Sequence, residues 1–175
     1  MPSKAGIHWA QCLAITCRSG YWIARLSRAA TRAQQMAYDP DNIFAKILDG
    51  EIPCHKIYED DDTLAFLDIM PRTEGHALVI TKKRARDLFD IKPEGLAKLM
   101  AAVQKLAPKI KEAVGADGVL IQQFNGSAAG QTVFHLHIHI VPVKHGVPLK
   151  PHAGIMEDQA RLAITAEKIR KKLKG

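Results

Sequence analysis

The feature that most constrains this chain is a run of alternating side chains, QTVFHLHIHIVPV, at residues 131–143. Successive side chains of a β-strand point to opposite faces of the sheet. A strand over 133–143 therefore places His135, His137 and His139 on one face, at intervals of about 7 Å. The other face carries an apolar stripe, which consists of Phe134, Leu136, Ile138 and Ile140. The run predicts a strand that packs on a core with one face and presents three imidazoles with the other.

Three chemistries are compatible with such a row of imidazoles. The histidines can form a cluster that binds or attacks a phosphate, they can be metal ligands, or they can be buried packing residues. Two histidines in the pattern H-x-H are a common pair of zinc ligands, and His76 is a candidate third ligand. A catalytic metal also needs carboxylates that orient its histidines, but no Asp or Glu lies within ten residues before His135 or after His139. The neutral donors and small residues at 125–132 favour a phosphate.

Residues 1–35 differ in composition from the rest of the chain. They contain five basic residues and no acidic one, so only +2 of the formal charge of +7 is left for residues 36–175. We interpret them as a basic N-terminal extension: a transit-like peptide, a disordered tail, or a segment upstream of a true start at Met36. Their apolar run IHWAQCLAITC is shorter than the roughly 20 residues that a membrane-spanning helix needs. We expect neither a membrane partner nor, for a nearly neutral domain, a specific nucleic-acid partner.

Cysteine usage bears on the compartment. Cys12, Cys17 and Cys54 are odd in number and form no C-x-x-C pair, which is typical of proteins in a reducing compartment. We therefore expect a cytoplasmic protein, or a mitochondrial one if residues 1–35 are a transit peptide.

The hydrophobic pattern of residues 36–175 predicts an α+β domain on a mostly antiparallel sheet. Strands are expected at 56–59, 63–69, 76–81, 118–125 and 133–143. Helices are expected within DNIFAKILDG at 41–50, over 93–114 and over 156–173. Asp41 or Asn42 is the expected N-cap of the first helix. Pro108 is expected to kink or split the second, because proline cannot donate the backbone hydrogen bond of a helix interior.

The string H-L-H-I-H-I-V at 135–141 resembles the signature of the histidine-triad (HIT) family. NIFAKILDGEIPCHKIYEDDDTLAFLDIMPRTEGHALVITKK at 42–83 is similar to the amino-terminal half of that family, and QQFNGSAAGQTVFHLHIHIVP at 122–142 is similar to its active-site hairpin. The resemblance is to bacterial-type HIT proteins of the purine nucleoside phosphoramidase branch. It implies a HIT-like fold with a five-stranded antiparallel sheet and two main helices per subunit. It also implies a homodimer whose sheet has ten strands.

The resemblance implies a role for each histidine. His137 would attack the α-phosphorus and form a nucleotidyl-histidine intermediate, with its other ring nitrogen held by the backbone carbonyl of His135. His139 would donate to the non-bridging phosphate oxygens, and His76 would complete the cluster. Thr132 would help to deliver a proton to the leaving group.

The resemblance also implies a nucleotide-binding set. Gln131 would lie near the bridging atom, Asn125 would bind the phosphate end of the nucleotide, and Asp68 would accept hydrogen bonds from both ribose hydroxyls. The base would lie in an apolar slot, whose members are Ile43, Phe44, Ile47, Ile52, Phe66, Ile69 and Leu78.

Departures from the family pattern refine these expectations. Some members bind structural zinc through cysteines at the positions of Asn42 and Ala45; because those cysteines are missing, we expect no metal and no cofactor. A transferase branch has Gln where this chain has His139, which favours hydrolysis. The tail after Val143 lacks the tryptophan-bearing terminus of the best-known phosphoramidases.

The resulting hypothesis is a hydrolase that cleaves P–N or P–O–P bonds of nucleoside, chiefly adenosine, phosphate conjugates. A dinucleoside polyphosphate hydrolase and a nucleotide-binding or partner-binding module with little turnover are the alternatives.

Overall fold

The structure is a computed structural model that describes residues 37–152 and 154–175, so the expectations for residues 1–35 fall outside the described residues. Residues Tyr38–Gly175 form one compact unit. Its elements, in chain order, are α2 (Ile43–Leu48), β1 (Lys56–Glu59), β2 (Thr63–Leu67), β3 (Ala77–Thr81), α3 (Pro93–Ala113), β4 (Gly118–Gln122), the 3₁₀ turn η2 (Ser127–Ala129), β5 (His137–Val143) and α4 (Gln159–Lys174).

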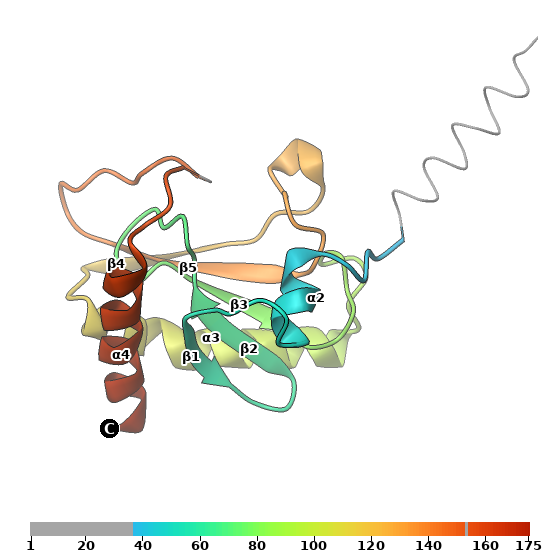
Figure 1. Cartoon of the computed structure of the whole chain (residues 1–175), viewed down its shortest axis with the longest axis horizontal. Coiled ribbons are helices and arrows are strands. Elements are labelled where there is room, and N and C mark those ends of the chain that lie inside the picture. The colour runs from blue at the N-terminus through green and yellow to red at the C-terminus, as the bar shows by residue number, and fades with distance from the viewer. Residues whose placement is uncertain (1–36, 153) are drawn as a thin grey trace, which may run out of the picture. The chain divides into compact units, whose positions relative to one another are not determined.

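One antiparallel sheet organises this unit (Figure 1). Its five strands follow the order β1-β2-β3-β5-β4, and each neighbouring pair is antiparallel. The predicted α+β class and five-stranded antiparallel sheet are confirmed. β1 and β4 are the edge strands.

Side chains on the two faces of the sheet enter two separate cores. One core joins alternate strand residues to α3 and α4: among its members are Ala65, Leu67, Val79, Leu99, Leu106, Ile138, Ile140 and Ile169. The opposite face is covered by α2, and its core consists of Phe44, Leu64, Phe66, Leu78 and Ile80. The helices α3 and α4 therefore lie on one face of the sheet and α2 on the other (Figure 1).

An N-cap stabilises α2, and packing on the sheet stabilises α3. Asn42 is the N-cap of α2, and its side-chain oxygen accepts hydrogen bonds from the backbone N–H groups of Phe44 and Ala45. α3 runs continuously through Pro108, so the expected split of this helix is wrong. Leu106 and Ile110 are fully buried on either side of the proline, and their packing on the sheet keeps the helix together despite one lost backbone hydrogen bond.

The start of the histidine strand differs from the prediction. β5 begins at His137 rather than at residue 133, because its partner β3 ends at Thr81 and the last paired residues are Ile80 and His137. Upstream of this point, the backbone N–H of Leu136 donates to the carbonyl of Ala85 in the loop that follows β3. The remaining predicted strands and helices end or begin within two or three residues of their observed bounds.

The predicted apolar stripe is correspondingly shorter. Leu136, Ile138 and Ile140 are buried in the core. Phe134 is half-buried outside it, with the guanidinium of Arg86 5.5 Å from the centre of its ring.

No helix among residues 37–152 and 154–175 combines the length and the apolar character that crossing a bilayer would require.

Candidate active site

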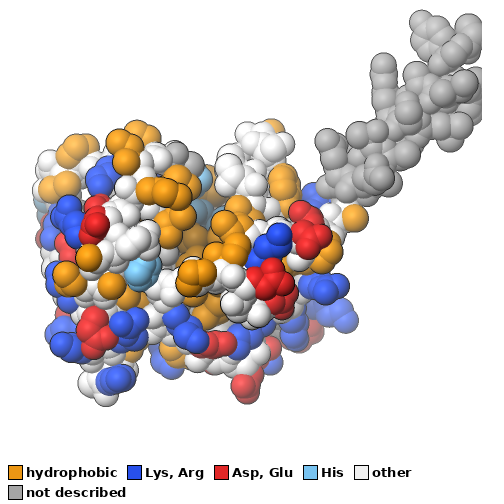
Figure 2. All heavy atoms as spheres, viewed as in Figure 1, with side chains coloured by type: hydrophobic (Ala, Val, Ile, Leu, Met, Phe, Trp, Pro, Cys, Tyr) orange, Lys and Arg blue, Asp and Glu red, His pale blue; other side chains and the backbone are white. Residues whose placement is uncertain are grey.

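The α2 face of the sheet carries a cavity of about 160 Å³ beside two of the three histidines. β3 and β5 are antiparallel neighbours, with Leu78 opposite His139 and Ile80 opposite His137. Ring centres of His137 and His139 are 5.0 Å apart. Figure 2 shows a hollow with hydrophobic side chains next to the position of α2. The alternation of β5 therefore turns these imidazoles into the cavity.

His137 is held with one ring nitrogen as a donor. Its Nδ1 lies 2.6 Å from the backbone carbonyl oxygen of His135. Because a carbonyl oxygen only accepts, the proton is on Nδ1 and the lone pair is on Nε2. Burial lowers the pKa of His137 below its ordinary value, while the His135 carbonyl partly opposes this shift. A neutral imidazole with an outward lone pair is the form that acts as a nucleophile.

The ring of His135 has a different environment. Its Nε2 donates to the carbonyl of Thr81 at 2.7 Å, and its Nδ1 accepts from the hydroxyl of Tyr38 at 2.6 Å. Both nitrogens are occupied, and the ring does not line the cavity. His135 lies on the same face as the other two imidazoles, because its ring centre is 6.2 Å from that of Phe44 in the α2-face core. Only His137 and His139 line the cavity, and His135 contributes its backbone carbonyl to His137. Tyr38 was not predicted as part of the site, because it stands alone in a short polar segment that forms no recognisable motif.

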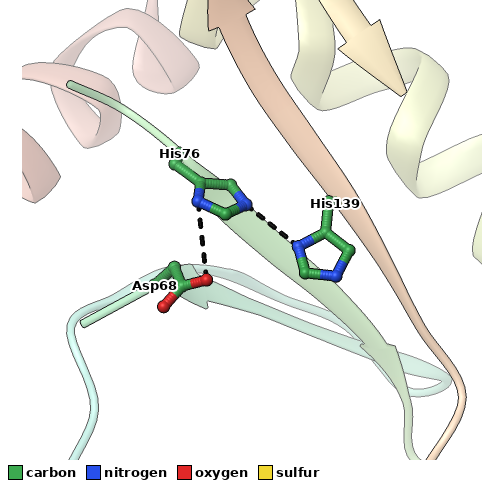
Figure 3. Close-up of side chains that lie close together, drawn as sticks. All are labelled: Asp68, His76 and His139. Carbon is green, nitrogen blue, oxygen red and sulfur yellow. Dashed lines mark hydrogen bonds and ion pairs between the residues drawn. The ribbon is translucent and has the colours of Figure 1, made fainter. Parts of the chain in front are cut away.

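His76 lies between Asp68 and His139 and connects them in a short chain of contacts (Figure 3). The backbone N–H of Arg72 donates to Nδ1 of His76 at 3.2 Å. Nδ1 of His76 is therefore an acceptor and Nε2 carries the proton, which is donated to Nδ1 of His139 at 2.9 Å. His139 in turn must carry its proton on Nε2. That Nε2 is buried and has no hydrogen-bond partner among the described residues. A buried donor without a partner in a cavity wall is suited to a ligand acceptor.

The charge states agree with this chain of donors. Burial, helped by a positive charge on His152, lowers the pKa of His76 to about 3. Burial and then the neighbouring His137 and His76 lower the pKa of His139 to about 2. Burial raises the pKa of the Asp68 carboxyl, although the N–H of Met70 and a charge on His152 oppose it. The 3.4 Å contact between Asp68 and His76 is therefore not a pair of full charges.

Among the described residues, these three side chains form the one cluster of possible ligands for a metal ion. One ligand atom each from Asp68, His76 and His139 lies within 4.8 Å of the others. The carboxylate that the sequence around the histidine strand lacks is thus supplied from the end of β2. For the structural zinc of some HIT proteins the fit is poor, because Asn42 uses its side chain as a helix cap and Ala45 has no ligand atom.

The apolar end of the cavity brings together the residues expected to hold a base. They are Ile43, Phe44, Ile47, Ile52, Phe66, Ile69 and Leu78, and Asp68 and Thr132 also line the cavity. Phe44 connects this end to the histidines, with its ring centre 5.1 Å from that of His137.

Asn125 and Gln131, which were expected near the phosphate, make their hydrogen bonds to other protein groups instead. The side-chain oxygen of Asn125 accepts from the backbone N–H of Leu88, and its amide donates to Gln123. Gln131 is buried and binds backbone groups of Gly126 and Arg86. Neither lines the cavity. Their hydrogen bonds fix the loop that precedes β5.

His152 lines the cavity but was not predicted. It is exposed and lies in an irregular segment between β5 and α4, where no periodic pattern could have marked it. Its ring centre is 5.4 Å from that of His139.

Comparisons with known proteins bear on the family and the fold. A family model described as HIT domain matches residues 49–146. Adenylylsulfatase HINT3 of Arabidopsis thaliana is 42% identical over 104 residues, which are 59% of this chain and 53% of that protein. Adenosine 5′-monophosphoramidase hnt1 of Schizosaccharomyces pombe is 42% identical over 100 residues, which are 57% of this chain and 72% of that protein. The crystal structure of a Hit-like protein involved in cell-cycle regulation from Bartonella henselae has a TM-score of 0.75 and 48% identity, and covers 78% of this chain and 99% of that chain.

Proposed function

The chain belongs to the HIT domain family, and from this premise we propose that it is a hydrolase of adenosine phosphate conjugates that works through a nucleotidyl intermediate on His137. The observation that carries the proposal is the hydrogen bond from Nδ1 of His137 to the His135 carbonyl, which leaves the lone pair of Nε2 for attack. The names of the Arabidopsis and Schizosaccharomyces relatives, which denote hydrolysis of adenylyl conjugates, support it.

In the proposed complex the adenine lies in the apolar slot under α2. Burying a flat apolar base there, beside Phe44 and Phe66, supplies affinity without charge. Asp68 is at the edge of the slot and accepts from the ribose hydroxyls. The α-phosphate then lies against His137 and His139.

The reaction proceeds in two displacements at phosphorus. Nε2 of His137 attacks the α-phosphorus, and the P–N or P–O bond to the leaving group breaks. The Nε2–H group of His139 has no hydrogen-bond partner among the described residues. It donates a hydrogen bond to a non-bridging oxygen of the α-phosphate. When the leaving group is an amine, it departs with the electron pair of the P–N bond and takes a proton from solvent, which the hydroxyl of Thr132 relays; the attacking water later returns a proton to solvent. Water then hydrolyses the nucleotidyl-histidine and releases the nucleotide. The low pKa of His76 and His139 keeps both rings neutral at pH 7, so His139 acts as a hydrogen-bond donor without becoming a cation.

We propose a homodimer for the active protein. β4 is an edge strand of the sheet and exposes Leu120 and Ile121, which are 37% and 41% exposed. An edge strand with apolar side chains is a template for pairing with a second copy, which would continue the sheet to ten strands.

We retain two proposals that follow from the sequence. Residues 36–175 are the HIT domain with its C-terminal helix, and residues 1–35 are an extension. The compartment is the cytoplasm, or the mitochondrion if the extension is a transit peptide.

The experiment is the hydrolysis of adenosine phosphoramidate and a diadenosine polyphosphate by the wild-type protein and by His137→Asn. Asparagine keeps a polar side chain but removes the nucleophile, so kcat should fall by at least ~10⁴, which is about 5.4 kcal/mol of barrier. A variant that keeps more than a tenth of the wild-type rate would contradict the role of His137. The ratio of kcat/KM for the two substrates separates a phosphoramidase from a dinucleoside polyphosphate hydrolase.

A further inference from the structure

The segment after β5 returns over the cavity and is fastened to the loop that carries Asp68. The backbone N–H of Lys150 donates to the carbonyl of Arg72 at 3.0 Å, and Nε of Arg72 donates back to the carbonyl of Lys150 at 3.2 Å. Nearer α4, the N–H of Glu157 donates to the carbonyl of Ile69 at 2.9 Å. These contacts fix the segment on both sides of His152.

His152 is thereby placed at the mouth of the cavity. It shares the cavity wall with His137 and His139. Its ring stands edge-on to His139, with centres 5.4 Å apart and planes at 68°, and edge-on to Phe124, at 5.4 Å and 71°. Within residues 37–152 and 154–175, its ring nitrogens have no hydrogen-bond partner. An exposed imidazole therefore lines the cavity beside His139.

A positive charge on His152 would act on the groups around the phosphate position. When its ring is protonated, the charge adds to the burial that lowers the pKa of His76 and of His139, and it opposes the burial that raises the pKa of Asp68. Whatever binds beside these residues experiences the same field. An anion is stabilised by it and a neutral group is not.

The cavity has an apolar end and a polar end, and this arrangement determines which part of the substrate lies beside His152. In the proposed function the apolar slot takes the base, and His137 and His139 take the α-phosphate. The leaving group then extends to the polar wall at the cavity mouth, where the structure has His152 and Thr132. In Figure 1, α2 and the segment that leads from β5 to α4 lie toward opposite sides of the view.

Resting on that proposed function, we propose that His152 binds the leaving group and makes the enzyme prefer oxyanions, such as the sulfate or phosphate of a mixed adenylyl anhydride, over neutral amines. When Nε2 of His137 bonds to the α-phosphorus, the P–O bond to the sulfate breaks, and the sulfate leaves with the electron pair and needs no proton. A hydrogen bond from His152 stabilises the charge that develops on it. Water then cleaves the nucleotidyl-histidine and gives adenylate.

The test compares kcat/KM for adenosine 5′-phosphosulfate and adenosine 5′-phosphoramidate in the wild type and three variants. Removing a charge-assisted hydrogen bond in His152→Ala should lower kcat/KM for the phosphosulfate about tenfold or more, and for the phosphoramidate less than about threefold. His152→Lys, which keeps a hydrogen-bond donor at this position and carries a fixed positive charge, should recover most of the phosphosulfate rate. His145→Ala is the matched control, because His145 is an exposed histidine of the same segment outside the cavity wall.

The outcomes separate the two proposals. Equal losses on both substrates, no loss on either, or a larger loss on the phosphoramidate would overturn the role of His152 while leaving His137 chemistry intact. If the wild-type protein hydrolyses neither substrate, the proposed function fails first and this inference fails with it. A merely structural effect of His152→Ala would move both rates together and leave their ratio unchanged.

Discussion

Replacing His76 with leucine tests whether a residue that does not line the cavity sets the proton position on His139. In the wild type, His76 accepts from the N–H of Arg72 and donates to Nδ1 of His139 at 2.9 Å. His76→Leu fills a similar volume but leaves both of these groups without a partner. His139 is then free to carry its proton on Nδ1 and to present a lone pair, rather than a donor, to the phosphate.

His76→Leu should lower both the free energy of unfolding and kcat. A buried polar group without a partner costs about 1–3 kcal/mol, so two such groups lower the free energy of unfolding by about 2–6 kcal/mol. Arg72 is partly exposed, which places the expected value in the lower half of that range. A hydrogen bond to a charged group contributes about 1.5–3 kcal/mol. Its loss from the transition state lowers kcat about 10- to 150-fold.

The assay joins kinetics, urea denaturation and nitrogen-15 NMR of the histidine rings. His76→Gln can still donate to His139 and accept from Arg72, so it should recover part of kcat. The control is His55→Leu, which removes the hydrogen bond between His55 and Gln159 outside the cavity and should leave kcat unchanged. A folded His76→Leu protein with more than half of the wild-type kcat, or with His139 still protonated on Nε2, would refute the reasoning.

Three more predictions concern acid, metal and assembly. His76 and His139 have folded-state pKa values of about 3 and about 2, below the ordinary 6.5, so between pH 6.5 and about 3 the unfolded chain binds protons that the folded chain does not. The free energy of unfolding should therefore fall with decreasing pH by about 1.4 kcal/mol per unit for each ring; denaturation curves with no slope between pH 6 and 4 would argue against buried neutral histidines. Exhaustive dialysis against EDTA should leave kcat unchanged, whereas a loss that zinc restores would make Asp68, His76 and His139 metal ligands. The double variant Leu120→Lys, Ile121→Lys should sediment as a monomer, whereas the wild-type protein should sediment as a dimer. A double variant with the mass of the wild-type dimer would place the dimer interface elsewhere.

Periodicity predicted the strands and helices because it follows directly from backbone geometry. Strand alternation separates Ile138 and Ile140, in the α3 core, from His137 and His139, in the cavity. Alternation does not indicate where a strand loses its partner. The start of β5 depends on the end of β3 at Thr81, a long-range fact that no local pattern contains.

Some residues of the site could likewise be predicted from the sequence, and others could not. The apolar slot could be predicted by resemblance because most of its members occupy fixed places on α2, β2 and β3, and Ile52 and Ile69 lie in the short segments next to them. His152 could not be predicted, because its position depends on one backbone and one side-chain hydrogen bond between Lys150 and Arg72, which lie far apart in the sequence. Asn125 shows a different failure: its side chain, expected at the phosphate, hydrogen-bonds to Leu88 and Gln123 instead and does not line the cavity.

The central claim is that Nε2 of His137 becomes covalently bonded to the nucleotide. Rapid acid-free quenching during turnover of adenosine phosphoramidate, followed by proteolysis and mass spectrometry, measures this directly. The account predicts an adenylyl group on the peptide that contains His137, absent from His137→Asn and lost when the quenched protein is acidified. Steady turnover by the wild-type protein with no adduct on that peptide, and no burst of the released amine, would contradict it.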